Sequence, residues 1–292
     1  PAATDRVIPV TNVPDTFIDE VADHTMTLIL ATFRRLTLMD RMAVEGFDFV
    51  DARHEQAAVD MANAWGRITG TPGVTLFTTP GHANAIPGLT LAGHVETPLV
   101  NISGCADQSR LGQGAMQEID QVGMAAPTTK GAWMVTDARR IPDMMAHALR
   151  VAFSGRRGPV HLTIPVDVQQ QEVSEDQVTF YQPSEYRSLA PTVASDGQVK
   201  AAIEILRSAQ RPLIIVGSAG AYSESGTALE ELIETTRVPL MTEGDARGMV
   251  SDAHPYCYGF FDSGLNRAAR LVRQADVVVL MGRKQDLIVG YA

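Results

Sequence analysis

Short apolar runs alternate with amphipathic helical stretches from residue 47 to about residue 180, and this alternation restricts the chain to few folds. The expected strands are 47–50, 74–78, 98–102 and 159–164. The helical stretches between them are 54–68, 84–93 and 140–153. Strands separated by helices of this length form parallel βαβ units. We therefore expect an α/β fold with helices on both faces of a doubly wound parallel sheet.

A second α/β pattern follows a stretch that has two prolines and no periodicity, which is typical of a linker. Here the expected helices are 197–208, 228–236 and 266–274, and the expected strands are 212–216, 238–242 and 275–281. The sequence thus predicts an atypical helical segment over 1–41, a first domain over 42–180, a linker over 181–195 and a smaller domain over 196–292. The chain lacks an initial Met and stops just after a strand-like run, so we expect a fragment with a truncated second domain.

The composition excludes several classes of protein. Hydrophobic residues make up 45% of the 292 residues and charged residues 20%, as in globular proteins. The net charge is -10 without a block of Lys or Arg, which argues against a nucleic-acid partner. No apolar run reaches the roughly 18 residues of a membrane span, and no signal peptide is recognisable. Cys105 and Cys257 lie far apart, outside any zinc-binding spacing. We expect a cytoplasmic protein.

Glu55 lies in Asp51-Ala-Arg-His-Glu-Gln-Ala-Ala58, between an expected strand and an expected helix. This junction belongs to the carboxyl edge of the sheet, where open α/β sheets bind ligands. An apolar helix face follows, formed by Ala58, Met61, Ala62, Trp65 and Ile68. From these residues alone, Glu55 is either a site residue or an exposed glutamate favoured by the helix dipole.

The segment Thr78-Thr-Pro-Gly-His-Ala-Asn84 follows the next strand. Pro80 and Gly81 indicate a tight turn, and Gly81 allows the backbone to approach a ligand closely. His82 is either a substrate contact that shuttles protons or a loop histidine that faces water. Asn84 is more typical of a helix N-cap than of a ligand contact.

Five stretches in register resemble thiamine-diphosphate-dependent enzymes, in particular the group of acetolactate synthase, oxalyl-CoA decarboxylase, 2-hydroxyacyl-CoA lyase and benzaldehyde lyase. They are residues 53–58, 73–81 with Asn84, 116–123, 127–130 and 158–166. The resemblance covers residues 47–292 and implies a thiamine-diphosphate-binding fold followed by a Rossmann-like central domain.

The resemblance also implies roles for single residues. Glu55 would hydrogen-bond N1′ of the cofactor's aminopyrimidine and favour the imino tautomer, whose 4′ nitrogen takes the proton from C2. Pro80, Gly81 and Asn84 would contact the cofactor. His82 and Gln117 would lie near the substrate, although Gln117 equally fits a surface residue. The family loop differs here, because Thr79 replaces its first glycine and His82-Ala83 replace a small residue and a hydroxyl.

The family's Mg²⁺ and diphosphate site, a Gly-Asp-Gly followed by Asn-Asn, does not occur in this sequence. Mg²⁺ should therefore bind through a diphosphate-binding domain beyond residue 292 or on another chain. The family assembles its site between subunits, which implies a homodimer or homotetramer and an inactive isolated chain. For the loop 216–220 in the central domain, three alternatives stay open: it binds FAD, an ADP-like nucleotide or no ligand.

Residues 1–41 contain motifs that resemble a different family. Thr11-Asn-Val-Pro14 and Glu20-Val-Ala-Asp-His24 resemble a helical stretch of D-2-hydroxyacid dehydrogenases, but the Gly-rich dinucleotide loop does not follow. Three hypotheses result. The first is part of a thiamine-diphosphate-dependent C–C lyase or synthase acting on 2-oxo acids, 2-hydroxyketones or 2-hydroxyacyl-CoA. The second is a non-catalytic assembly fragment or subunit. The third is a remnant of an NAD-dependent 2-hydroxyacid dehydrogenase.

Overall fold

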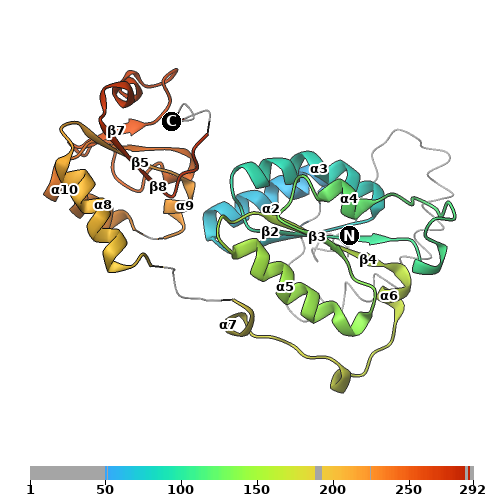
Figure 1. Ribbon diagram of the computed structural model, residues 1–292. Coiled ribbons are helices and arrows are strands. Elements are labelled where there is room, and N and C mark those ends of the chain that lie inside the picture. The colour runs from blue at the N-terminus through green and yellow to red at the C-terminus, as the bar shows by residue number, and fades with distance from the viewer. Residues whose placement is uncertain (1–49, 51, 188–192, 224, 287–288, 290–292) are drawn as a thin grey trace, which may run out of the picture.

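The computed structural model describes residues 50, 52–187, 193–223, 225–286 and 289. Figure 1 shows two α/β units joined by an extended connection. The expected segment 1–41 and most of the expected strand 47–50 lie outside the described residues.

The first unit is built on a four-stranded parallel sheet. Its strands are β1 (Gly73–Phe77), β2 (Leu99–Cys105), β3 (Ala132–Met134) and β4 (Pro159–Pro165), in the order β1-β2-β4-β3. The parallel α/β arrangement predicted from the sequence is confirmed. The three-residue β3 is not predicted, because so short a run leaves no periodic signal.

Helices cover both faces of this sheet. Figure 1 shows α2 (Glu55–Thr69), α3 (Thr79–His94) and α4 (Gln121–Ala125) on one side and α5 (Ile141–Phe153) on the other. Val59, Leu89 and Leu99 belong to the core on the first side, and Val100, Ala148 and Leu162 to the core on the second. The remaining elements of this unit and the connection are η1 (Gln108–Arg110), η2 (Ala138–Arg140), α6 (Val166–Gln170), η3 (Glu175–Gln177) and α7 (Pro183–Tyr186).

The ends of α2 follow from local chemistry. The His54 side chain caps its start by accepting from the Gln56 N–H, and Gly70 ends it with φ 68°. Glycine adopts this left-handed conformation without a Cβ penalty. A glutamate in the first turn and Arg67 in the last turn both suit the helix dipole.

The second unit repeats the architecture. Its sheet has the order β7-β6-β5-β8, with β5 (Pro212–Val216), β6 (Leu240–Thr242), β7 (Cys257–Phe260) and β8 (Val277–Met281), all parallel. Its helices are α8 (Asp196–Ser208), α9 (Ser218–Ala221), α10 (Gly226–Thr236), η4 (Gly244–Ala246) and η5 (Arg267–Gln274). The helix expected over 266–274 is thus a 3₁₀ helix.

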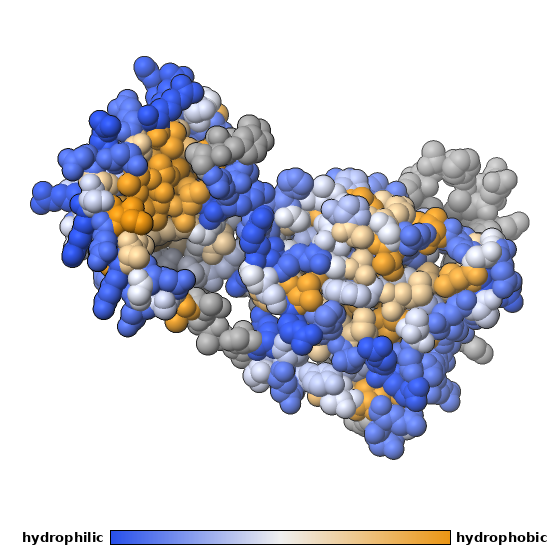
Figure 2. Space-filling view, in the orientation of Figure 1, coloured by the Kyte–Doolittle hydropathy of each residue, from blue (hydrophilic) through white to orange (hydrophobic). Residues whose placement is uncertain are grey.

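Alternate residues of β5 pack on opposite faces of this second sheet. Ile214 packs in the core with Ile233 of α10, and Ile215 packs in the core with Ala269 of η5. Some apolar surface stays exposed. In Figure 2 it gathers over the region of β5 and β8. Val278 of β8 is among the exposed apolar side chains.

The two units meet through a small set of polar contacts. Arg67, in the last turn of α2, forms a bidentate ion pair with Asp245 of η4. Lys284 Nζ donates to the carbonyl of His94, over 3.2 Å. The guanidinium of Arg157 lies 4.3 Å from the ring centre of Tyr222. The carboxyl edge of the second sheet therefore faces the amino edge of the first.

No helix in the described part of the chain is long and apolar enough to cross a membrane.

Candidate functional site

Glu55 lies at the carboxyl edge of the first sheet, as the topology requires. It is the first residue of α2, and α3, which packs beside α2, begins immediately after β1. The Glu55 side chain is half-buried. Glu55 therefore lies at the edge where doubly wound sheets bind ligands.

Two residues of α3 fix the Glu55 carboxylate. Asn84 Nδ2 donates to Glu55 Oε2 over 3.1 Å. A Cβ atom added to Gly81 would lie 2.9 Å from Glu55 Cγ and 3.1 Å from Phe77 Cβ, so only glycine fits between these side chains. The structure thus brings Glu55, Gly81 and Asn84 together.

The details of this loop correct two interpretations. The helix expected over 84–93 begins at Thr79, with Thr78 as its N-cap and Pro80 in its first turn. Asn84 therefore lies inside the helix, and its interpretation as an N-cap is wrong. Pro80 and Gly81 form the first helical turn instead of a tight turn, because proline suits the first helical positions, where no N–H partner is needed.

His82 is fully buried behind the site. Its ring stacks on that of His161 with centroids 4.0 Å apart, and the Asn101 side-chain amide lies 2.9 Å from Nδ1 of both rings. His82 Nε2 lies 3.2 Å from the carbonyl oxygen of Gln121. A substrate contact for His82 stays a prediction, and its observed contacts are those of a core residue.

Hydrogen-bonding rules fix the proton positions in this cluster. Burial lowers the pKa of His82, and burial together with His82 lowers the pKa of His161 to about 3, so both rings are neutral. The Gln121 carbonyl only accepts, which places the His82 proton on Nε2 and makes Nδ1 an acceptor. We therefore assign the Asn101 amide nitrogen to the position between the rings, and its oxygen to the side of Thr75 Oγ1.

Gln117 lies in the segment between β2 and α4, at the same carboxyl edge, and its side chain is exposed. Its φ is 60°, a left-handed value that is uncommon outside glycine. The structure places Gln117 at the edge that holds Glu55, and a shared role of the two residues stays a prediction. The backbone strain at Gln117 carries no signal in the sequence, because glutamine has no preference for this conformation.

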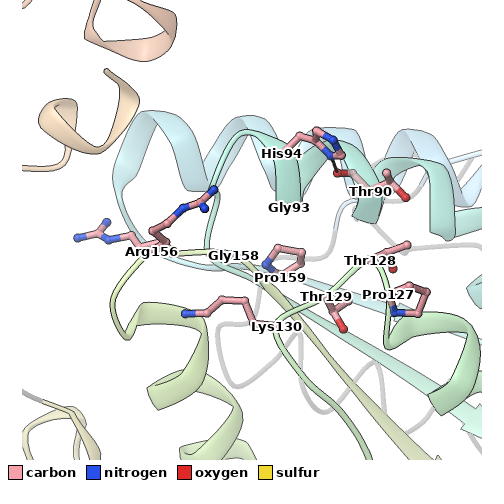
Figure 3. A pocket seen from close by; sticks show the side chains of 11 residues that line it. Thr90, Gly93, His94, Pro127, Thr128, Thr129, Lys130, Arg156, Gly158 and Pro159 are labelled. Carbon is pink, nitrogen blue, oxygen red and sulfur yellow. Dashed lines mark hydrogen bonds between the residues drawn. The ribbon is translucent and has the colours of Figure 1, made fainter. Parts of the chain in front are cut away.

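A cavity of about 350 Å³ lies at the opposite, amino edge of the sheet. Figure 3 shows Lys130 and Arg156 at one end and Thr128 and Thr129 at the other. Its Lys and Arg side chains already have acceptors. Lys130 Nζ donates to the carbonyls of Val151 and Ser154, Arg156 pairs with Glu96, and Arg157 Nη1 donates to the carbonyl of Gly70 over 3.5 Å. This cavity is therefore a poor anion site.

Within the residues that the structure describes, no group of three or more His, Cys, Asp or Glu side chains could hold a metal ion.

Comparison with known families identifies the class. Residues 15–124 match the family described as thiamine pyrophosphate enzyme, N-terminal TPP binding domain. Residues 199–291 match the thiamine pyrophosphate enzyme, central domain. The chain therefore belongs to the thiamine pyrophosphate enzymes and carries their N-terminal and central domains. The resemblance to thiamine-diphosphate-dependent enzymes predicted from the sequence is confirmed. The match begins at residue 15, within the segment 1–41 for which a resemblance to dehydrogenases was predicted.

Three relatives illustrate the enzymes to which the chain is similar. The chain is 31% identical over 259 residues to a 2-hydroxyacyl-CoA lyase from Arabidopsis thaliana, covering 87% of this chain and 44% of that protein. It is 32% identical over 244 residues to a probable acetolactate synthase large subunit from Methanococcus aeolicus, covering 82% and 40%. It is 33% identical over 255 residues to an oxalyl-CoA decarboxylase from Escherichia coli K12, covering 85% and 43%. The chain spans less than half the length of each of these relatives.

Proposed function

We propose that this chain supplies the pyrimidine side of the cofactor site in a thiamine-diphosphate-dependent lyase or synthase. Its reaction would cleave or form a carbon–carbon bond next to the carbonyl of a 2-oxo acid, 2-hydroxyketone or 2-hydroxyacyl-CoA. The names of the relatives, which include enzymes of CoA thioesters and an acetolactate synthase, support this range. The observation that carries the proposal is the half-buried Glu55 carboxylate, held by Asn84 against Gly81.

The chemistry of the residues present fits an aminopyrimidine. Gly81 lets the backbone of α3 approach the Glu55 side chain closely, and Asn84 restrains the carboxylate through one oxygen. In this arrangement Glu55 would hold a proton at N1′ of the pyrimidine. Gly81 and Pro80 would present main-chain atoms to the ring. When bound, thiamine diphosphate supplies an electron sink for the carbanion formed in carbon–carbon cleavage.

The other half of the site would come from elsewhere. Mg²⁺ and the diphosphate group need carboxylate and amide oxygens, which a diphosphate-binding domain outside residues 1–292 would supply. That domain would lie in the same protein or on another chain. Assembly as a homodimer or homotetramer would bring the two halves together.

We infer that the central domain holds no FAD or ADP-like nucleotide at the carboxyl end of β5. A nucleotide loop binds phosphate with free main-chain N–H groups. Here the N–H of Gly217 donates to Met281 O over 2.9 Å, that of Ala219 to Gly282 O over 3.1 Å, and that of Gly220 to Gly217 O over 2.8 Å. Gly244 and Gly282 pack against this loop so closely that neither has room for a Cβ.

The test of the main proposal is Glu55→Gln in the complete protein that contains this chain. Loss of the carboxylate should lower the rate of C–C bond cleavage about a hundredfold or more, the usual size of a general acid–base contribution. Glu172→Gln, on the exposed surface, is the matched control. Full activity of Glu55→Gln would favour the non-catalytic assembly module instead.

A further inference from the structure

Gln117 has an unusual backbone conformation, with a φ of 60°, that no helix end accounts for. The described residues include two other non-glycine residues with positive φ, Glu96 and Arg237. Both follow the last turn of a helix, where the left-handed conformation is common. Gln117 follows no helix. Strained residues of this kind persist only where the neighbouring structure holds them, and they cluster at functional sites.

The adjacent Glu118 holds this loop. Its Oε1 accepts from the N–H of Gly112, and its Oε2 accepts from the N–H of Ala115 over 3.0 Å. These main-chain N–H groups lower the pKa of Glu118, because they stabilise the charged carboxylate. Gly112 and Gly114 have φ values of 81° and 72°, which let the chain fold around the carboxylate.

The neighbouring acid makes a different set of contacts. The Asp120 carboxylate accepts from the N–H of Gly123 over 2.8 Å and so caps α4. Glu118 therefore acts on residues 112–115, whereas Asp120 acts on the helix that follows. The two carboxylates are two residues apart and serve separate structures, which makes Asp120 a matched control.

We propose that Glu118 is a positioning residue, which fixes the loop 112–118 so that Gln117 is presented to the substrate at the carboxyl edge. This inference rests on the proposed function, because it takes Gln117 as a substrate contact. Glu118 itself has its carboxylate turned to main-chain N–H groups, and it acts through Gln117.

Hydrogen exchange of the full 292-residue chain tests the structural half. Glu118→Gln keeps the shape of the side chain but places its NH₂ group against a main-chain N–H donor. The amides of Gly112 and Ala115 should exchange at least about tenfold faster in Glu118→Gln, the factor expected for losing one charge-assisted hydrogen bond. Asp120→Asn should leave them unchanged. Equal exchange in Glu118→Gln and the unaltered chain would overturn the proposal.

Steady-state kinetics of the complete enzyme test the functional half, with pyruvate or a 2-hydroxyacyl-CoA as substrate. Glu118→Gln should raise KM several-fold with little change in kcat, and this effect should vanish in a Gln117→Ala background, because Glu118 acts through Gln117. An undiminished effect in that background would contradict the proposal. If the unaltered enzyme does not bind thiamine diphosphate, the proposed function itself is refuted.

Discussion

The side-chain amide of Asn84 donates a 3.1 Å hydrogen bond to Glu55 Oε2, which joins the first turn of α2 to the second turn of α3. The sequence separation of 29 residues makes this a tertiary contact. The same pair of helices buries Val59 against Leu89. The carboxylate is thus positioned by the helix packing that forms the core.

Asn84→Asp would place a second carboxylate against Glu55. Like charges at this distance repel, so we expect Asn84→Asp to be less stable than Asn84→Ala by about 1 kcal/mol at pH 7. The difference should disappear when Glu55 is changed to Gln. Urea unfolding of the four variants measures it, and an unchanged difference in the Glu55→Gln background would show that the introduced carboxylate repels another group.

Gly81→Ala and Gly197→Ala should have opposite effects on stability. Alanine at position 81 would press a Cβ against Glu55 and Phe77, and such overpacking costs about 1–3 kcal/mol. Position 197, in α8, has open space around an added Cβ, and alanine there should add up to about 1 kcal/mol. Thermal unfolding of both variants tests this, and a stabilised Gly81→Ala would disprove the close contact.

Most of the fold could be predicted from periodicity, whereas its irregular parts could not. The strand 212–216 and the helix 54–68 were predicted almost to the residue, because both have clear patterns and clear ends. The sequence does not indicate the β7 strand, since Cys257–Phe260 contains a glycine and pairs irregularly with β6. Register shifts of this kind depend on the neighbouring strand.

For the candidate site, the sequence indicates residue types but not the contacts between them. Glu55 and Gly81 carry local signals, namely a carboxylate at a strand–helix junction and a glycine after a strand. The burial of His82 depends on His161 and Asn101, which come from other strands. Such long-range partners leave no local pattern, and a histidine that follows Pro-Gly looks like a loop residue.

Stability should fall as the solution becomes acidic from pH 6.5. The folded-state pKa of His161, about 3, lies below its unfolded value, so protons bind the unfolded chain more tightly. The stabilisation is therefore complete above pH 6.5 and is lost progressively towards pH 3. At pH 5 the loss due to His161 should be about 2 kcal/mol relative to pH 7.5.

Urea unfolding at several pH values tests this pH dependence. His161→Gln should flatten the profile between pH 7.5 and pH 5, whereas His94→Gln, on the surface, should leave it as it is. A profile that is identical for His161→Gln and the unaltered chain would assign the acid sensitivity to another group. Lower overall stability of His161→Gln does not affect the test, because only the slope is compared.

FAD and ADP should bind this chain with dissociation constants weaker than about 1 mM, which corresponds to about 4 kcal/mol of binding free energy. The reason is that the N–H groups of Gly217, Ala219 and Gly220 already donate to main-chain carbonyls. Isothermal titration calorimetry and FAD fluorescence measure this. Micromolar binding of either nucleotide would mean that the loop opens.

The helix α2 links two distant parts of the molecule. Its 15 residues form a rod about 22 Å long, with Glu55 at one end and Arg67, bound to Asp245, at the other. Val59, between these two ends, is buried in the core. One helix thus carries the carboxylate at its first turn and a contact with the second unit at its last turn, so a single rigid element supports both.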